Sequence, residues 1–183
     1  MNLTEDILAI YQARGAAAYF GERVTMTEHG LQAAYFAQLS GAPKALVVAA
    51  LLHDIGHLIE PVPDALEDWT ADAHHEAAGA RWLAQHFPSG VSEPVRLHVA
   101  AKRYLCATDA QYVARLSPAS VHTLKLQGGP MSAQAVAQFQ TERHGADAVR
   151  LRHWDDQGKV AGLKTPTLRE YLALIEELAA PQA

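Results

Sequence analysis

Several features common in other classes of protein are missing from this chain of 183 residues. Its one cysteine, Cys106, cannot form an intramolecular disulfide, and we expect a reducing, cytoplasmic location. No apolar run reaches the roughly 18 residues of a membrane span, and the start, Met1–Ile7, is acidic where a secretion signal would be basic. The net charge of −5 includes no basic cluster, which argues against nucleic acids and anionic membranes as partners.

An apolar content of 49% is present, and it is enough for a folded core. The apolar residues recur at helical spacing, and no convincing alternating strand, internal repeat or linker is found. The length suits one domain. We therefore expect a single, compact all-α domain over residues 1–183.

Capping and turn signals divide the chain into expected helices. Asn2 and Glu5 match a capping box before a helix over about residues 3–18. Gly41 ends a helix over about 27–39, and Pro43 opens a very apolar helix that runs into His53. The other expectations are a loop over about 61–70, a helix over about 72–87, a helix capped by Ser92, helices after Ser117 and Thr165 with prolines in their first turns, and, after a break at 127–131, a long helix over about 132–155.

Ten histidines are more than such a chain needs, and they point toward a metal. The run Ala50–His57 places His53 and Asp54 side by side at the end of an apolar stretch. Divalent iron, manganese and zinc accept imidazole and carboxylate ligands. His53 alone would more often be a satisfied core residue, but a buried Asp54 costs several kcal/mol unless a cation compensates it. On a continuous helix, His57 would stand one turn further on as a group that faces the metal or the substrate.

Further residues of ligand type lie in other segments: His29, either His74 or His75, His98 and Asp155. Each of them alone also suits a polar surface. Together with His53 and Asp54 they make four imidazoles and two carboxylates, enough for two metals if Asp54 bridges them. The lack of thiolate ligands excludes an iron–sulfur cluster and favours iron or manganese with nitrogen and oxygen ligands.

Basic residues accompany these ligands along the chain. Lys102 follows His98 by one helical turn, and Arg152 comes one turn before Asp155. Ser120 stands at an expected helix start. Basic side chains and a hydroxyl at a helix start suit a phosphate or a phosphonate. The alternative reading is a solvated basic edge.

The segment Tyr19–Glu22 lies between the first two expected helices, shortly before His29. Gly21 gives this turn conformational freedom, so the side chains of Tyr19 and Glu22 could fold over a metal site. A tyrosine and a glutamate in a loop are more often surface residues.

The order of His29, His53–Asp54 and Asp155 resembles the signature of the HD-domain superfamily, an all-α fold whose usual chemistry is metal-assisted phosphoester hydrolysis. With His75 and His98 added, the pattern resembles the two-metal subset, which includes inositol-oxygenase-like enzymes. Over roughly residues 15–160, the chain looks more closely like the phosphonate-cleaving dioxygenases of that subset. The blocks that carry this likeness are Glu28–Gln38, Ala50–His57, His98–Leu105, Gln127–Met131 and Trp154–Asp155.

That resemblance implies a pair of iron ions, Fe(II)/Fe(III), with dioxygen as co-substrate. The implied ligands of the first iron are His29, His53, Asp54 and Asp155. Those of the second iron are His75, His98 and the shared Asp54.

The resemblance also implies roles around the substrate. Lys102, Ser120 and Arg152 would hold the phosphonate, and His57 would lie near the reacting carbon. Tyr19 would occupy the second iron until substrate displaces it, and Glu22 would face the nitrogen of the substrate. The implied reaction cleaves the C–P bond of 1-hydroxy-2-aminoethylphosphonate or of its N-trimethyl analogue, which gives glycine or glycine betaine plus phosphate.

Some alternatives stay open. A primary ammonium needs hydrogen-bond acceptors, whereas a trimethylammonium favours aromatic faces with a carboxylate, and Glu22 suits both. The same ligands could instead activate water in a metal-dependent phosphohydrolase. A catalytically inert metal-binding module fits poorly with so complete a ligand set. The oligomeric state and the role of residues 58–74 are not indicated.

Overall fold

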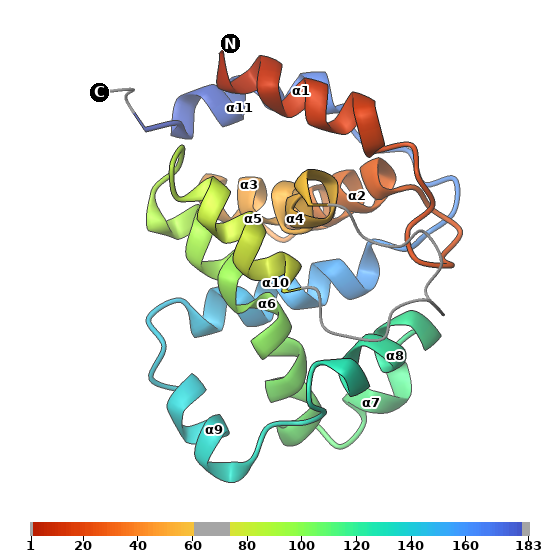
Figure 1. Cartoon of the computed structure of the whole chain (residues 1–183), viewed down its shortest axis with the longest axis vertical. Helices are drawn as coiled ribbons and strands as arrows, with labels where there is room; N and C mark the ends of the chain where they lie inside the picture. The colour runs from red at the N-terminus through yellow and green to blue at the C-terminus, as the bar shows by residue number, and fades with distance from the viewer. Residues whose placement is uncertain (1, 61–73, 181–183) are drawn as a thin grey trace.

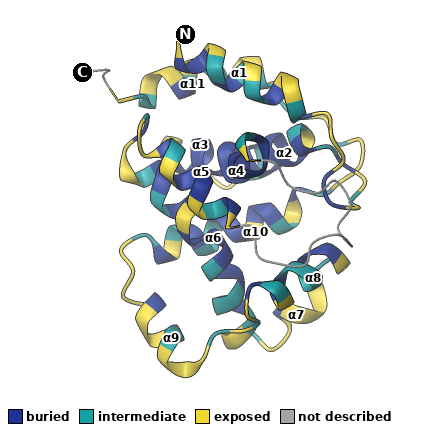
Figure 2. Cartoon of the chain, viewed as in Figure 1, coloured by how far each residue is buried: buried dark blue, intermediate teal, exposed yellow. Residues whose placement is uncertain are grey.

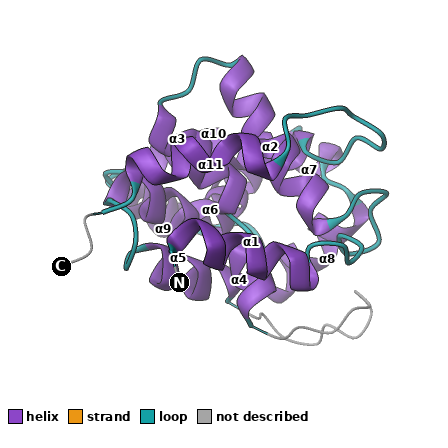
Figure 3. Cartoon of the chain, turned by 90° about the horizontal axis from the view of Figure 1, so that it is seen from above, coloured by secondary structure: helices purple, strands orange, loops and turns teal. Residues whose placement is uncertain are grey.

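The computed structural model describes residues 2–60 and 74–180, and this part of the chain is largely helical (Figure 3). The helices are α1 (Leu3–Arg14), α2 (Met26–Leu39), α3 (Lys44–Leu52), α4 (Ile55–Ile59), α5 (His75–Leu83), α6 (Ser89–Thr108), α7 (Tyr112–Arg115), α8 (Pro118–Leu126), α9 (Ala133–Phe139), α10 (Gly145–Gln157) and α11 (Leu168–Leu178). In the described residues, strand-like pairing is limited to one bridge between Ala18 and Thr25. The predicted all-α fold is confirmed.

The long helix α6 runs through the middle of the molecule (Figure 1). It packs against α10, α5 and α3, while α2 packs against α3 and α10. Helices α1 and α11, far apart in the sequence, contact each other and lie at one end, and α7, α8 and α9 gather toward the other. Segments from the whole described chain thus surround α6 and α3. No helix in the described part is long and apolar enough to cross a membrane.

Helix α3 explains where the core lies. All of its residues from Leu46 to Leu52 are buried, and a helix that is apolar on every side must be enclosed by other elements. Burying a Val or Leu side chain contributes about 1.5–3 kcal/mol. Figure 2 shows this buried centre and the exposed outer faces of α1, α9 and α11. Because His53 and Asp54 directly follow α3, the core helix delivers both polar side chains into the middle of the protein.

The first helix begins as predicted but ends earlier. The Asn2 N–H donates to the Glu5 carboxylate at 3.1 Å, which completes the predicted capping box. Helix α1 stops at Arg14 instead of residue 18, because Gly15 packs against the start of α2. The Thr27 N–H donates to the Gly15 carbonyl at 2.9 Å, and a Cβ at Gly15 would lie 2.1 Å from Thr27 Oγ1.

The predicted long helix over 132–155 is wrong. Two helices, α9 and α10, replace it, with a break at residues 140–144. At the break the Thr141 hydroxyl donates to the Gln138 carbonyl at 2.7 Å, a local bond that competes with helix continuation. The break preceding α9 is confirmed, since Gly128 and Gly129 both have positive φ (87° and 70°).

Three other helix starts can be compared with the prediction. Ser117 caps α8 as predicted, with its hydroxyl accepting from the Ser120 N–H at 3.3 Å. Helix α6 begins at Ser89 instead of after Ser92, because the first-turn N–H of Val91 already donates to the Pro88 carbonyl. Helix α11 begins after Thr167 rather than Thr165.

The cause of the α11 shift is another capping box, in which the Thr167 N–H donates to the Glu170 carboxylate at 2.7 Å. The helix expected over about 72–87 corresponds to α5, which covers residues 75–83. Its expected first residues and the expected loop over about 61–70 lie outside the described residues.

Candidate metal centre and anion pocket

Four residues that are far apart in the chain bring their ligand atoms together at the centre of the protein. We call His29, His53, Asp54 and Asp155 the first ligand group. The His29 Nε2 atom lies 3.0 Å from His53 Nε2 and 3.5 Å from Asp54 Oδ2. It also lies 3.4 Å from Asp155 Oδ1. All four side chains are buried, so α2, α3 and α10 converge on a polar point inside an apolar core.

The orientation of the two rings is fixed by the main chain. His29 Nδ1 lies 2.9 Å from the Gly158 carbonyl, and His53 Nδ1 lies 2.8 Å from the Ala50 carbonyl. Because a carbonyl only accepts, each Nδ1 carries a proton, and Nε2 is the atom that each ring turns toward the other. Two Nε2 atoms 3.0 Å apart repel unless a proton or a metal ion lies between them.

The pKa of His53 also indicates that the first ligand group favours a positive charge. Burial lowers the pKa of His53, but the charge and the hydrogen bond of Asp54, helped by Asp155, outweigh burial and raise it to about 9. The site therefore favours a positive charge beside its carboxylates, and a metal ion would supply it in place of a proton.

A second ligand group consists of His75 from α5, His98 from α6 and the same Asp54. The His75 and His98 Nε2 atoms lie 3.1 Å apart. They lie 3.4 Å and 3.6 Å from Asp54 Oδ1, while Asp54 Oδ2 faces the first ligand group. Burial raises the pKa of Asp54, but the histidines around it lower it well below its ordinary value, so the carboxylate stays ionised. Asp54 therefore has the geometry of a bridge between two metals.

His75, and not His74, is the inward member of the adjacent pair. The His74 side chain is 72% exposed, against 8% for His75. The close crossing of α4 and α5 places His75 beside Asp54. A Cβ at Gly56 would lie 2.0 Å from the His75 carbonyl, and a Cβ at Gly79 would lie 3.2 Å from Gly56 N. Glycine at both positions lets the two backbones touch.

His57 reaches the site by a different route from the one expected. Helix α3 ends before His53, and a new helix begins at Ile55, so His53 and His57 do not share one continuous helix. The His57 ring stacks on His75 with centroids 3.8 Å apart, and it meets the Phe20 ring edge-on at 4.7 Å. Burial and the neighbouring His75 lower the pKa of His57 well below its ordinary value. His57 therefore lines the pocket as a neutral ring.

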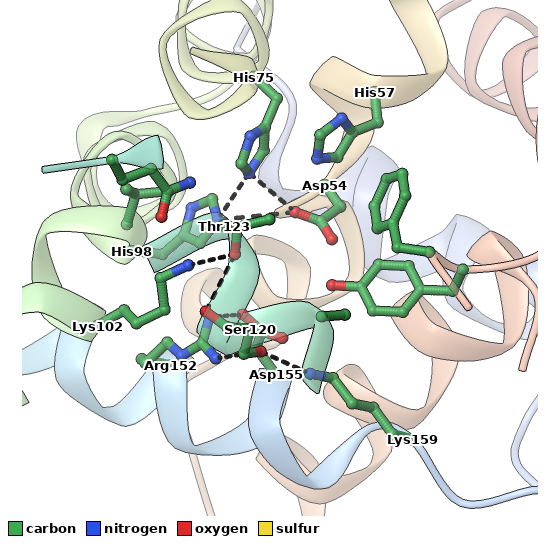
Figure 4. A pocket seen from close by; sticks show the side chains of 15 residues that line it. Asp54, His57, His75, His98, Lys102, Ser120, Thr123, Arg152, Asp155 and Lys159 are labelled. Carbon is green, nitrogen blue, oxygen red and sulfur yellow. Dashed lines mark hydrogen bonds and ion pairs between the residues drawn. The ribbon is translucent and has the colours of Figure 1, made fainter. Parts of the chain in front are cut away.

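The expected cations line a pocket together with Asp54, His75, His98 and Asp155 (Figure 4). Lys102 is only 3% exposed, and its Nζ donates to Thr123 Oγ1 at 2.8 Å. Burial, followed by repulsion from Arg152, lowers the pKa of Lys102 to about 7. Ser120 lines the pocket from the first turn of α8. A buried ammonium beside hydroxyl groups is suited to an anion.

Arg152 joins this anion pocket to the first ligand group. It donates to Asp155 Oδ2 at 2.7 Å and to Ser120 Oγ at 3.3 Å. On its other side it is held by Tyr112, whose hydroxyl accepts at 3.0 Å, and by the Asp156 carboxylate. Burial opposes the charge of Arg152, but the two aspartates raise its pKa well above the ordinary value. The guanidinium is thus fixed before any ligand arrives.

The Tyr19–Glu22 segment is a tight turn that covers the pocket. The Glu22 N–H donates to the Tyr19 carbonyl at 2.7 Å, and both central residues have positive φ, 44° for Phe20 and 79° for Gly21. Gly21 adopts this conformation without strain, whereas Phe20 does so at some cost. The turn directs the Phe20 ring into the pocket.

Tyr19 lies directly over one imidazole and one carboxylate of the first ligand group, those of His29 and Asp54. Its ring stacks on His29 with centroids 3.8 Å apart. Burial, followed by the charge of Asp54, raises the pKa of Tyr19 well above its ordinary value, and a hydrogen bond with the Asp54 side chain acts in the same direction. All twelve residues singled out from the sequence therefore lie around this centre.

The sequence analysis missed other residues that line the pocket, among them Phe20, Thr123, Gln127 and Lys159. Thr123 comes one turn after Ser120, a spacing that could have identified it. Lys159 is four residues after Asp155, but α10 ends at Gln157, so helical spacing does not predict its direction. Phe20 gave no signal, because its inward direction depends on the turn geometry.

Comparison with known proteins agrees with this geometry. A family model described as the HD domain matches residues 18–126, more than half of the chain. The chain belongs to the HD-domain family. The matched range includes every ligand of the second group and three of the four in the first, Asp155 being outside it.

Two similar proteins have names that report an activity. A [1-hydroxy-2-(trimethylamino)ethyl]phosphonate dioxygenase (glycine-betaine-forming) from Leisingera caerulea is 46% identical over 177 residues, which cover 97% of this chain and 90% of the relative. A hydroxymethylphosphonate dioxygenase from Gimesia maris is 46% identical over 160 residues, 87% of this chain and 80% of the relative. An uncharacterized protein of Acanthamoeba polyphaga mimivirus is 33% identical over 173 residues. The predicted family is confirmed.

Proposed function

We propose that this HD-domain protein is a metal-dependent dioxygenase that cleaves the C–P bond of a 1-hydroxyphosphonate. Both named relatives are phosphonate dioxygenases at 46% identity. The observation that carries the proposal is one buried pocket in which two groups of metal-ligand type meet at Asp54, next to Lys102, Ser120 and Arg152. In the proposed reaction dioxygen accepts four electrons, the C1 hydrogen is lost and the carbon becomes a carboxylate while phosphate is released.

The residues present fit a pair of iron ions. The first ligand group offers two imidazoles and two carboxylates, and the second offers two imidazoles and the shared Asp54. These nitrogen and oxygen donors suit iron or manganese. Bound iron, Fe(II)/Fe(III), would supply the electron transfer to dioxygen, while the protein supplies binding and orientation.

The side chains around the metals have distinct proposed tasks. Lys102, Ser120 and Arg152 bind the phosphonate oxygens, because all three line one pocket and Arg152 already bonds Ser120 there. His57, neutral and packed between His75 and Phe20, lies near the reacting carbon. As a neutral imidazole, His57 can accept or donate a hydrogen bond to the substrate without adding a positive charge to the pocket.

The Tyr19–Glu22 turn is proposed to control access. Tyr19 covers His29 and Asp54, so a substrate that ligates the metals must displace its hydroxyl. That coupling would keep dioxygen from an unoccupied metal position until substrate arrives. Glu22 is proposed to face the group that substrate carries beyond C1, either a primary ammonium or a trimethylammonium.

Two broader proposals accompany this function. Residues 1–183 form one HD domain, which is supported by a core cluster that contains Ile7 of α1 and Ile175 of α11. A cytoplasmic location is supported by the single cysteine.

Oxygen dependence tests the function directly. Iron-loaded protein should release phosphate from 1-hydroxy-2-aminoethylphosphonate, its N-trimethyl analogue or hydroxymethylphosphonate in air and not under anaerobic conditions. Zinc-loaded protein is the control and should be inactive, because zinc cannot change its oxidation state. Equal phosphate release without oxygen would instead identify a phosphohydrolase.

A further inference from the structure

Lys159 occupies a position between two polar parts of the pocket. It follows α10, and its side chain is 11% exposed. Its Nζ donates to Ser120 Oγ at 3.1 Å, and Ser117 Oγ lies 3.4 Å away. On the other side it lies 3.8 Å from Glu22 Oε1. One flexible ammonium therefore reaches both the Ser120 hydroxyl, beside which Figure 4 shows Lys159, and the Glu22 carboxylate of the Tyr19–Glu22 turn.

Within the described residues, Glu22 Oε1 is buried and makes no hydrogen bond. Its charged neighbour is Lys159, at a distance that is longer than a hydrogen bond but short enough for an ion pair. A half-buried carboxylate needs a compensating charge. Lys159 supplies it from inside the protein, at the place where a cationic substrate would also supply it.

The two cations therefore compete for one carboxylate. A substrate with a cationic nitrogen gains from Glu22 only to the extent that Lys159 gives it up. A phosphonate without a nitrogen leaves the Lys159–Glu22 pair in place and still benefits from the positive charge near Ser120.

We infer that Lys159 is a specificity-determining residue, which lowers the preference of the pocket for phosphonates with a cationic nitrogen over those without one. This inference rests on the proposed function for its substrate class. It concerns the ratio between two ligands and not the absolute affinity for either.

The test uses a matched pair of unreactive ligands, so that it does not depend on turnover. The ligands are 2-aminoethylphosphonate and propylphosphonate, which has a methyl group in place of the ammonium. Their dissociation constants are measured by calorimetry on iron-loaded, anaerobic protein for the parent and for Lys159→Met. Lys164→Met, at an exposed lysine in the same loop, is the matched control.

Lys159→Met should increase the affinity for 2-aminoethylphosphonate relative to propylphosphonate by about tenfold, the size expected when a partly buried charge pair is exchanged. Lys164→Met should leave this ratio unchanged. Adding Glu22→Gln to Lys159→Met should abolish the gain, because the carboxylate under competition is then gone.

An equal loss of affinity for both ligands in Lys159→Met would overturn the inference and make Lys159 a plain anion-binding residue. A gain that persists after Glu22→Gln would overturn it as well. The proposed function is judged separately, by oxygen-dependent phosphate release from the parent protein, so either conclusion can fail while the other stands.

Discussion

The two ligand groups share Asp54, yet they are held in different ways. In the first group, His29 and His53 both direct Nδ1 to backbone carbonyls, at 2.9 Å and 2.8 Å. In the second group, His98 is held in the same way by the Val95 carbonyl at 2.7 Å. His75 Nδ1 instead faces the Glu76 carboxylate at 3.5 Å, which is longer than a hydrogen bond.

This difference shows that the two ligand groups are not equally preorganised. The first group takes its orientation from the main chain, which no side-chain change removes, and it has a carboxylate of its own in Asp155. The second group depends partly on a side chain, and its carboxylate is shared. We therefore expect the first position to bind metal more tightly and the second to empty first during chelation.

Removing the shared carboxylate should have the largest effect on metal content, because both positions depend on it. Asp54→Ala should reduce the metal content from about two ions per chain to near zero, since both positions lose an anionic ligand. Elemental analysis of protein purified with iron measures this. Asp147→Ala, on the outer part of α10, is the control. A variant that kept both metals and near-normal turnover would show that Asp54 does not bridge them.

Removing one ring from each group should separate the two positions. His53→Ala and His98→Ala should each lose about one metal. The ion left in His98→Ala should resist a chelator better than the ion left in His53→Ala. Competition with a chelator, monitored by a metal-dependent absorbance, measures the affinity of the remaining ion in each variant. The variant of an exposed histidine, His153→Ala, is the control. The reverse order would contradict the proposed ranking of the positions.

The two ligand groups also differ in the cation beside them, which is Arg152 at the first group and Lys102 at the second. Lys102→Met should weaken phosphonate binding by roughly 10- to 100-fold and leave the metal content intact, because Lys102 bonds Thr123 and no metal ligand. Arg152→Met should weaken binding and also lower the metal content, because it removes the donor to Asp155. Calorimetry with elemental analysis measures both effects, and Lys125→Met on α8 is the control. Metal loss in Lys102→Met would mean that the anion pocket is misplaced.

Glu76 offers a smaller effect that is specific to the second group. Glu76→Gln should lower metal affinity at the second position by about tenfold, as expected when the partner of a ligating histidine is changed. The first position should be unaffected. Metal titrations of Glu76→Gln and of the control variant Glu93→Gln measure the affinity of each position. An equal loss at both positions would point to a general loosening of the fold.

The last prediction concerns the pH dependence of folding and not the binding of a metal or a ligand. The folded protein lowers the pKa of Lys102 to about 7 by burial, whereas the unfolded chain has the ordinary value of 10.5. Between these values the unfolded state binds the additional proton, so this group makes the free energy of unfolding rise with pH. Urea unfolding of the metal-free parent and of Lys102→Met, at about pH 7 and about pH 10, should show a smaller rise in the variant.

Much of this centre was predictable because it depends on spacing within helices. Lys102 follows His98 by four residues, and Arg152 precedes Asp155 by three, so helical geometry alone places each cation beside a ligand. The apolar run of α3 likewise predicted that His53 would be buried. The roles of these residues stay predictions until the variants above are measured.

Other parts depend on contacts that a local pattern does not contain. The helix that was expected to join His53 to His57 is interrupted at Asp54, whose ψ of 13° is not helical. At the break near Thr141, a side-chain hydrogen bond to the Gln138 carbonyl competes with continuation of the helix. Lys159 lies beyond the end of α10, where helical spacing no longer predicts direction.

The close crossing of α4 and α5 has a consequence for protein engineering. Gly56 has no room for a Cβ, because the His75 carbonyl would lie 2.0 Å away, and a backbone atom cannot swing aside as a flexible side chain can. Any larger residue at this position must push α5 outward and carry His75 with it. A single methyl group at Gly56, which leaves every side chain of the two ligand groups in place, should thus weaken the second metal position while sparing the first.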